Sequence, residues 1–418
     1  MLKLFRFVLI FVSFCVSNNL YSQKLSISIY NSIPLSTILV TPTQGQYNLI
    51  IGDSTYNLKV NQILYLSRLG DSIVVRTANQ ILGTWKRVTI IGKTGNDVIR
   101  VKPIVPATPA RLYDDNLSFY VDINKILAIN LIDQEKYIAA VVEAEGGYHR
   151  NPEFYKVQAM LVRTYTLSHS NRHQSEGFNL CDEVHCQAYK GRSDNNSDIL
   201  DAVLDTKGLI IVDSANHPIT AAFHANCGGE TANSGDVWVK PLPYLVSVHD
   251  KYCTSSPSAR WQRTVPTKEW FKMLADFGVD TSTVLKRDDV DFDPSDRPVY
   301  YTVKGVKIPV KEIRKRFMLR SAWFSVSLGR KEVRLNGRGY GHGVGLCQDG
   351  AMVMADKGFS YDEIVKYYYK GVKIVDSGTL DSLQLSTDTL EIPREEPMGP
   401  MPKPDFMDQD HRNHKPNR

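Results

Sequence analysis

Two adjacent helical patterns, with β-like sequence before and after them, constrain the fold more than any other feature of this chain. In "LIDQEKYIAAVVEAEGG", Asp133 is placed to cap a helix, and the pair Gly146 and Gly147 is placed to end it. In "NPEFYKVQAMLVRTYTLSHS", Asn151 is placed to cap a second helix, with Pro152 at its first position. The elements follow no regular strand–helix alternation, so we expect an α+β fold.

The residues before the first helix are rich in short β-like runs. "YNLII", "QILYLS" and "SIVVRT" are separated by turn sequences such as "LGDS" and "GKTGND". They predict a small β-rich accessory domain over residues 23–120, which carries no cluster of catalytic residue types. Further helices are expected in "TKEWFKMLADFG", "QDGAMVMADKG" and "SYDEIVKYYYKG", and two strands around a turn in "GLIIVDSANHPITAAFHANCGGET".

Both ends of the chain have distinctive compositions. A basic start, a short apolar run and a small residue before Gln23 are typical of a signal peptide over residues 1–22, which predicts export. A membrane anchor, or a lipid anchor on Cys15, is the alternative. Residues 393–418 are polar and proline-rich and predict a disordered tail. The net charge of +5 is too small to indicate nucleic-acid binding.

Glu145 is the strongest single candidate for chemistry. It lies on one helical face with Ile138, Val141 and Val142, in the last turn of the predicted helix. Neighbouring apolar side chains and the negative end of the helix dipole both raise the pKa of a carboxyl group, which suits a general acid. An ordinary exposed glutamate at a helix end is the alternative.

Arg163 interrupts the apolar stretch "MLVRTYTL" and would need a partner if it were buried. Glu145 is one candidate partner and an anionic substrate group is another. An exposed arginine is the interpretation that the spacing alone favours.

The segment "HQSEGFNLCDEVHC" gathers His173, Cys181, His185 and Cys186 within a short stretch. Two thiolates and two imidazoles suit a tetrahedral structural zinc ion. A Cys181–Cys186 disulfide with two surface histidines is the alternative, and the sequence leaves both open.

The other cysteines after residue 22 are Cys227, Cys253 and Cys347. A disulfide between Cys227 and Cys253, with Cys347 as a buried thiol, is the interpretation that we favour. A thiol enzyme using His224 with Cys227, or His342 with Cys347, is the rival hypothesis.

A dense glycine loop, "GRGYGHGVGLCQDGA" at residues 337–351, lacks the lysine and hydroxyl residue of a phosphate-binding P-loop. Read with "YIAAVVEAE", "KVQAMLVRTYTL", "CQAYKG", "FHANCGGET" and "PYLVSVHD", in this order, it resembles the SpoIID/LytB family. The resemblance runs from about residue 120 to 376 and implies a domain over residues 121–378. Where the family often carries Met-Pro after the glutamate, this chain has Gly146 and Gly147.

The resemblance implies a mixed helix and sheet domain with a glycan groove that acts on peptidoglycan. It implies a lytic transglycosylase in which Glu145 is the single acid and base, forming 1,6-anhydro-muramic ends on peptide-stripped strands without a catalytic cofactor. It places five residues at the substrate, with the glycine loop lining one side of the groove: Lys156, Arg163, Tyr244, His342 and Gln348. Some members hold zinc at the segment that contains Cys181.

The same resemblance leaves a second function open, that of a noncatalytic peptidoglycan-binding protein that enhances an amidase. The partners it implies are glycan strands and an N-acetylmuramoyl-L-alanine amidase, with no nucleic acid. The location that it implies, together with the signal peptide, is the periplasm or the cell envelope. For the glycine loop itself, a tight structural turn with a hydrogen-bonded His342 is the alternative to a groove wall.

Overall fold

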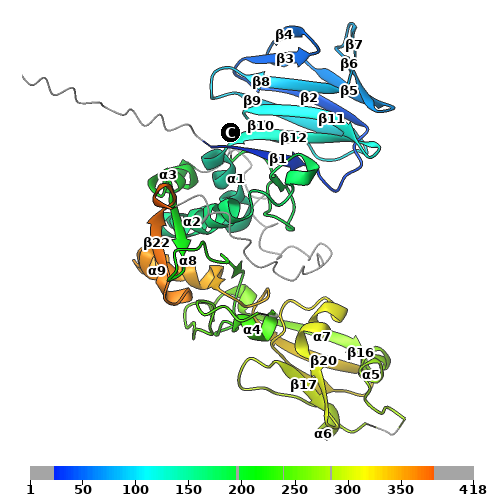
Figure 1. The fold of residues 1–418 in the computed structure, drawn as a ribbon. Helices are drawn as coiled ribbons and strands as arrows, with labels where there is room; N and C mark the ends of the chain where they lie inside the picture. Colours follow the sequence, from blue (N-terminus) through cyan, green and yellow to red (C-terminus); the bar gives the residue numbers. More distant parts are fainter. Residues whose placement is uncertain (1–22, 194–196, 239, 283–284, 381–418) are drawn as a thin grey trace, which may run out of the picture.

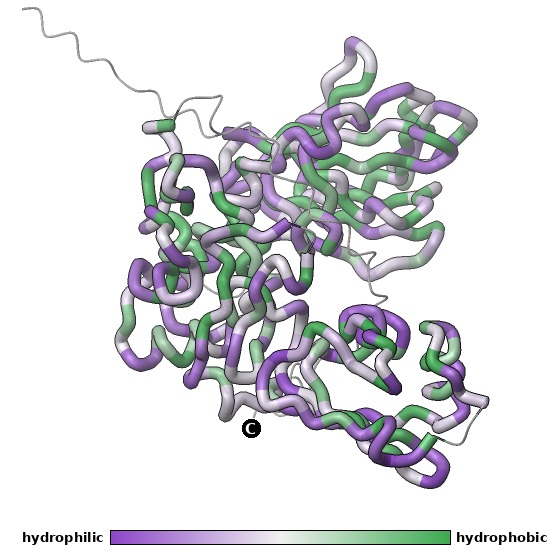
Figure 2. The backbone as a smooth tube through the Cα atoms, turned by 60° about the horizontal axis from the view of Figure 1, so that its bottom comes forward, coloured by the Kyte–Doolittle hydropathy of each residue, from purple (hydrophilic) through white to green (hydrophobic). Residues whose placement is uncertain are grey.

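Alternating burial builds two sheets from the first part of the chain. The computed structural model describes residues 23–193, 197–238, 240–282 and 285–380, so the expected signal peptide and tail lie outside the described residues. Along strands such as β2 and β3, side chains alternate between buried and half-buried positions. Figure 2 shows many hydrophobic segments, in green, among the strands of these sheets. Figure 1 shows these sheets on one side of a layer of helices, with a smaller unit on the other side.

The first sheet has the order β13 (Leu180–Cys181), β1 (Lys24–Ile29), β12 (Lys125–Asp133), β11 (Asn116–Asp122), β8 (Arg87–Gly92), β3 (Tyr47–Ile51) and β4 (Ser54–Leu58). The second has the order β10 (Arg111–Asp114), β9 (Val98–Val105), β2 (Thr37–Gln44), β5 (Leu64–Leu69), β6 (Ser72–Arg76) and β7 (Ile81–Trp85). Their pairings are antiparallel except for β1 with β13. The expected domain boundary at residue 120 falls inside β11, because β11 and β12 form a hairpin that continues the sheet to Asp133.

The helical layer follows β12 directly. It contains α1 (Gln134–Gly146), α2 (Pro152–Ser168), α3 (Ser197–Asp205), α4 (Ser234–Val237), α8 (Gln348–Asp356) and α9 (Tyr361–Tyr368). The caps expected at Asp133 and Asn151 are confirmed, since each side chain accepts backbone N–H bonds from the first turn of its helix. One continuous hydrophobic core joins the two sheets to α1 and α2, so the β-rich region and the helices share their interior.

Two short strand pairs tie the helical layer to the end of the described chain. β14 (Leu209–Val212) pairs with β22 (Lys373–Asp376), and β15 (Phe223–His224) pairs with β21 (Leu346–Cys347). The two strands expected around one turn are therefore present, but each takes a C-terminal strand as its sheet partner. No helix within the described ranges is long and apolar enough to span a bilayer.

A separate core lies within residues 257–338. It is built from β16 (Arg260–Pro266), β20 (Glu332–Arg338) and β19 (Phe324–Leu328), the hairpin β17 (Tyr300–Val303) and β18 (Val306–Pro309), and the helices α5 (Thr267–Asp276), α6 (Arg287–Val290) and α7 (Val310–Phe317). The 3-10 turns are η1 (Gln174–Glu176), η2 (Pro257–Ala259) and η3 (Ser377–Thr379). This unit is inserted between segments of the helical layer, at the far end from the sheets (Figure 1).

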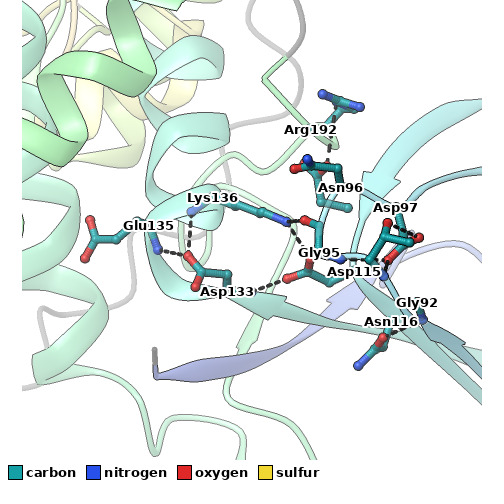
Figure 3. A network of polar contacts seen from close by, with 12 residues as sticks. Gly92, Gly95, Asn96, Asp97, Asp115, Asn116, Asp133, Glu135, Lys136 and Arg192 are labelled. Carbon is teal, nitrogen blue, oxygen red and sulfur yellow. Dashed lines mark hydrogen bonds and ion pairs between the residues drawn. The ribbon is translucent and has the colours of Figure 1, made fainter. Parts of the chain in front are cut away.

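A polar network fixes the start of α1 against the sheets (Figure 3). The Asp133 N–H donates to Asp115 Oδ2 at 2.8 Å, and Lys136 Nζ contacts Asp115 Oδ1 at 2.6 Å and the Gly95 carbonyl at 2.7 Å. The side chain of Asp133 is half-buried and that of Asp115 is buried, so the two bonds to Asp115 are partly shielded from water and are stronger there, whereas the bond to the Gly95 carbonyl is exposed. The direction in which α1 leaves the sheet is thereby set.

A buried ion pair joins α1 to α2. Arg163 Nη2 donates to Glu135 Oε2 at 2.6 Å, and the side chains are 0% and 11% exposed. The guanidinium also donates to the carbonyls of Val203 and Leu209, each at 3.1 Å. The partner of Arg163 is therefore Glu135 and not Glu145. Both glutamates are on α1, but at opposite ends of the helix.

We expect Glu135→Ala to lower the free energy of unfolding by about 3–5 kcal/mol, because it leaves a fully buried guanidinium without its counterion. The exposed pair Asp362–Lys366 on α9 provides the control, and Asp362→Ala should cost less than about 1 kcal/mol. Urea unfolding measures both. Equal losses in the two variants would contradict the structural role given to Glu135.

Candidate functional site

Glu145 lies in the last turn of α1 with a half-buried side chain. Its Oε1 accepts a hydrogen bond from the Ala188 backbone N–H at 3.1 Å. Burial raises the pKa of the Glu145 carboxyl, while the Ala188 N–H and the positive charge of Lys190 oppose that rise. A carboxyl group in such surroundings keeps its proton closer to neutral pH than an exposed glutamate does.

The segment that carries Ala188 is anchored in the core through Gln187. The Gln187 Oε1 accepts hydrogen bonds from the Tyr137 hydroxyl at 3.3 Å and from the Thr166 hydroxyl at 3.0 Å. Tyr137 is on α1 and Thr166 is on α2, so both helices hold this segment. Sequence reasoning missed Ala188 because its contribution is a backbone N–H, which no residue type identifies.

Glu143 does not share the surroundings of Glu145. Its Oε2 accepts a hydrogen bond from the Ser193 hydroxyl at 2.5 Å. The influences on the pKa of Glu145 are burial, the Ala188 N–H and Lys190, and none of these is a carboxylate. The carboxyl groups of Glu143 and Glu145 are thus held by different partners.

Gln348 contacts Glu145, but its side chain bonds to the Glu145 backbone and not to the carboxyl group. Gln348 is the first residue of α8, and its Nε2 donates to the Glu145 carbonyl at 3.2 Å. This bond satisfies one of the free carbonyls at the end of α1. Gln348 thus holds the helix end that carries the carboxyl group.

His342 lies on a different surface. It borders a pocket of about 870 Å³ between the helical layer and the inserted unit, together with Trp238, Arg297 and Arg314. Its Nδ1 accepts the Val344 N–H at 3.0 Å, and its ring lies 5.8 Å from the ring of Trp238. Glu145 does not border this pocket.

Three of the expected substrate contacts have partners within the protein in this conformation. Arg163 is fully buried against Glu135. The side chain of Tyr244 is only 7% exposed, and its hydroxyl accepts the Thr220 N–H at 2.9 Å. Lys156 forms ion pairs with Glu153 at 3.1 Å and Asp205 at 3.3 Å, which connect α2 to α3.

The glycines of the loop at residues 337–351 approach another segment of the protein. At Gly345, with φ +72°, a Cβ atom would lie 2.2 Å from the Ala222 carbonyl oxygen. At Gly341, with φ +109°, a Cβ atom would lie 2.8 Å from the Cβ of His224. Both the backbone conformation and the lack of space exclude larger residues. The dense glycines therefore serve packing against β15, in agreement with the structural-turn alternative.

The four residues expected to hold zinc come together. The donor atoms of His173, Cys181, His185 and Cys186 all lie within 4.8 Å of one another, and Cys186 Sγ is 3.4 Å from His173 Nε2. The other ring nitrogen of His173 contacts Glu176 Oε1 at 2.6 Å. A metal-binding histidine commonly donates its second N–H to a carboxylate in this way, so the donor set fits a tetrahedral zinc ion.

The remaining cysteines form a second group. Cys227 and Cys253 are free thiols with their sulfur atoms 3.3 Å apart, so the expected disulfide is not formed in this structure. The donors gathered around Cys227 and Cys347 are the thiol of Cys253 and the carboxylate of Asp250, and no imidazole belongs to this described group. The arrangement gives no support to either of the proposed Cys–His pairs.

Comparison with known proteins supports the resemblance seen in the motifs. Residues 122–212 match the family model "Stage II sporulation protein". The chain is 30% identical over 262 residues to stage II sporulation protein D of Bacillus subtilis, covering 59% of this chain and 76% of that protein. The corresponding protein of Bacillus amyloliquefaciens is 31% identical over 265 residues, covering 59% and 75%.

A further relative carries a different name. The amidase enhancer of Bacillus subtilis is 26% identical over 274 residues, which cover 53% of this chain and 38% of that protein. The part of the chain that matches the family model contains Glu145 and the donor cluster around Cys181. On the strength of these matches, the chain belongs to the SpoIID/LytB family.

Proposed function

We propose that this protein is a peptidoglycan lytic transglycosylase in which Glu145 is both acid and base. The observation that carries the proposal is the Glu145 carboxyl, half-buried at a helix end with a raised pKa and no carboxylate acting on it. Glycosidases that use water generally need two carboxyl groups beside the scissile bond. A transglycosylase needs one, since a hydroxyl group of the substrate itself is the nucleophile.

In the proposed reaction, protonated Glu145 gives its proton to the glycosidic oxygen as the bond to the muramic C1 breaks. The resulting carboxylate then accepts the proton of the C6 hydroxyl, whose oxygen bonds to C1 and closes a 1,6-anhydro ring. The Ala188 N–H holds Oε1 and steadies the carboxylate after it loses its proton. The proton returns to Glu145 within one turnover, so the reaction needs no cofactor.

A noncatalytic role as an amidase enhancer is the second candidate. It is favoured by the match to the Bacillus subtilis protein of that name, although the match covers 38% of that relative. Under this hypothesis the protein would bind glycan strands and an N-acetylmuramoyl-L-alanine amidase without cleaving a bond. Both hypotheses describe a cell-wall function and require an exported protein in the periplasm or cell envelope, as the sequence of residues 1–22 predicts.

We also propose that His173, Cys181, His185 and Cys186 hold one structural zinc ion. With four protein ligands, such an ion has no open position for substrate and would serve the fold. Cys186 lies two residues before Ala188. The ion would therefore fix the segment whose N–H binds Glu145.

Glu145→Gln should lower glycan cleavage by about 10²-fold to 10⁴-fold, because the amide keeps the shape but cannot transfer the proton. The loss is measured by incubating peptide-stripped glycan strands with each protein and counting anhydro-muramic ends by mass spectrometry. Glu143→Gln is the matched control, since that side chain is on the same helix and bonds to Ser193.

Full cleavage by Glu145→Gln would contradict the assignment of the acid. If the wild-type protein cleaves neither intact nor peptide-stripped strands but accelerates a purified amidase, the second candidate function replaces the first.

The raised pKa of Glu145 makes a prediction about stability. The folded protein binds the Glu145 proton more tightly than the unfolded chain does, so its stability falls as pH rises above the ordinary glutamate value of about 4.3. Glu145→Gln removes this loss. We expect its Tm to exceed that of wild type at neutral pH, and the difference to shrink as the pH falls to about 4. A Tm difference that does not vary with pH would show an ordinary pKa.

Cys181→Ser combined with Cys186→Ser should remove one zinc ion per chain and lower the cleavage rate, because the Ala188 segment loses its anchor. Elemental analysis and the glycan assay measure the two effects. Val184→Ala, an exposed position in the same loop, is the control for nonspecific damage. Unchanged metal content in the double cysteine variant would contradict the zinc assignment.

A further inference from the structure

A second group of metal-binding residue types lies away from the His173 cluster. Cys227 follows β15, Asp250 and Cys253 lie in the segment before β16, and Cys347 ends β21. All four residues are buried. Their sulfur and carboxylate donor atoms lie within 4.8 Å of one another, although the chain separates the first from the last by 120 residues.

The distances suit one shared ion. Cys227 Sγ is 3.3 Å from Cys253 Sγ and 3.3 Å from Asp250 Oδ2. Zinc–sulfur bonds of about 2.3 Å in a tetrahedron place the sulfur ligands about 3.8 Å apart. An outward shift of each sulfur atom by a few tenths of an ångström therefore makes room for the ion.

The surroundings of these donors resemble the outer shell of a metal–thiolate site. Cys347 Sγ accepts the Cys227 N–H at 3.3 Å and the Gly350 N–H at 3.4 Å. Asp250 Oδ2 accepts the Tyr368 hydroxyl at 3.0 Å. Such donors orient the ligands and stabilise their negative charge, which three neutral thiols would not require.

A positive group offsets part of the charge of the ligands. Three thiolates and a carboxylate around a divalent cation leave two net negative charges inside the protein. The guanidinium of Arg297 lies beside the group and donates to the Cys227 carbonyl at 2.5 Å. Cys347 also caps the N-terminus of α8, where the helix dipole favours a negative charge.

We propose that Cys227, Asp250, Cys253 and Cys347 bind one structural Zn²⁺ ion. Binding replaces the three thiol protons, which are released to solvent, and leaves no open position on the metal. A Cys227–Cys253 disulfide accounts for only two of the four buried groups and leaves Cys347 and Asp250 in contact without a shared partner.

The site has a definite place in the fold. The chain passes from Cys253 into the inserted unit of residues 257–338 and returns through the glycine loop to Cys347. An ion bound by Cys253 and Cys347, where the chain enters and leaves that unit, and by Cys227 would connect the base of the inserted unit to β15. It would also fix the start of α8, where Gln348 contacts the Glu145 carbonyl.

The test compares the zinc content of the full chain with that of Cys227→Ser combined with Cys347→Ser, by elemental mass spectrometry after gel filtration. We expect the variant to hold one zinc ion fewer per chain, whatever the occupancy of the His173 cluster. Equal zinc content, or iron in place of zinc, would overturn the proposal.

A second measurement keeps the test decisive if that variant does not fold. Cys181→Ser combined with Cys186→Ser leaves the proposed site intact and should retain one zinc ion per chain, whereas a content of zero would overturn the proposal. Peptide mapping of wild type, alkylated in denaturant and chelator without a reductant, should find Cys227, Cys253 and Cys347 all modified. A Cys227–Cys253 cross-linked peptide would establish the disulfide instead.

Discussion

The geometry of the site depends on how α1 leaves the sheet. β12 passes into α1 without a loop, and Asp133 ends the strand and caps the helix at once. Asp115, which follows β10, accepts the Asp133 N–H and pairs with Lys136 of α1, and the Arg163–Glu135 pair holds the first turn of α1 against α2. A rigid helix fixed at its start also fixes its end, where Glu145 lies. The N-terminal sheets are thus the support on which the carboxyl group is positioned, through a core that they share with α1 and α2.

Local signals made α1 and α2 predictable, whereas contacts between residues far apart in the sequence could not be predicted. Caps at Asp133 and Asn151 and the glycine end of α1 act within one turn, so the sequence contains all that determines them. The partner of Arg163 depends on which carboxylate the fold brings to it, and spacing could not distinguish Glu135 from Glu145. The pairing of β14 with β22 joins residues more than 150 positions apart. The donor group at Cys181 was visible because its members are close in sequence, and the one containing Cys227 was not.

The glycine loop shows that one motif is compatible with two kinds of close contact. Its glycines suggested a backbone that approaches a ligand, but at Gly345 the approach is to the Ala222 carbonyl oxygen. Close packing against β15 explains the same residues without a ligand. The loop also leads into α8 and so places Gln348 at the end of α1. The loop acts through the position that it gives to a neighbouring helix.

Each of the two donor groups contains a cysteine that lies within two residues of a hydrogen-bond donor to Glu145. Cys186 lies two residues before Ala188, whose N–H binds the carboxyl group, and Cys347 immediately precedes Gln348, whose amide binds the carbonyl of the same residue. Ala188 lies in a stretch without helix or strand, and Gln348 begins α8 directly after the two-residue strand β21. The acid and base role proposed for Glu145 would require its neighbours to be held to a fraction of an ångström. Cross-links by buried cysteine and histidine side chains are one way to achieve that rigidity where secondary structure is short.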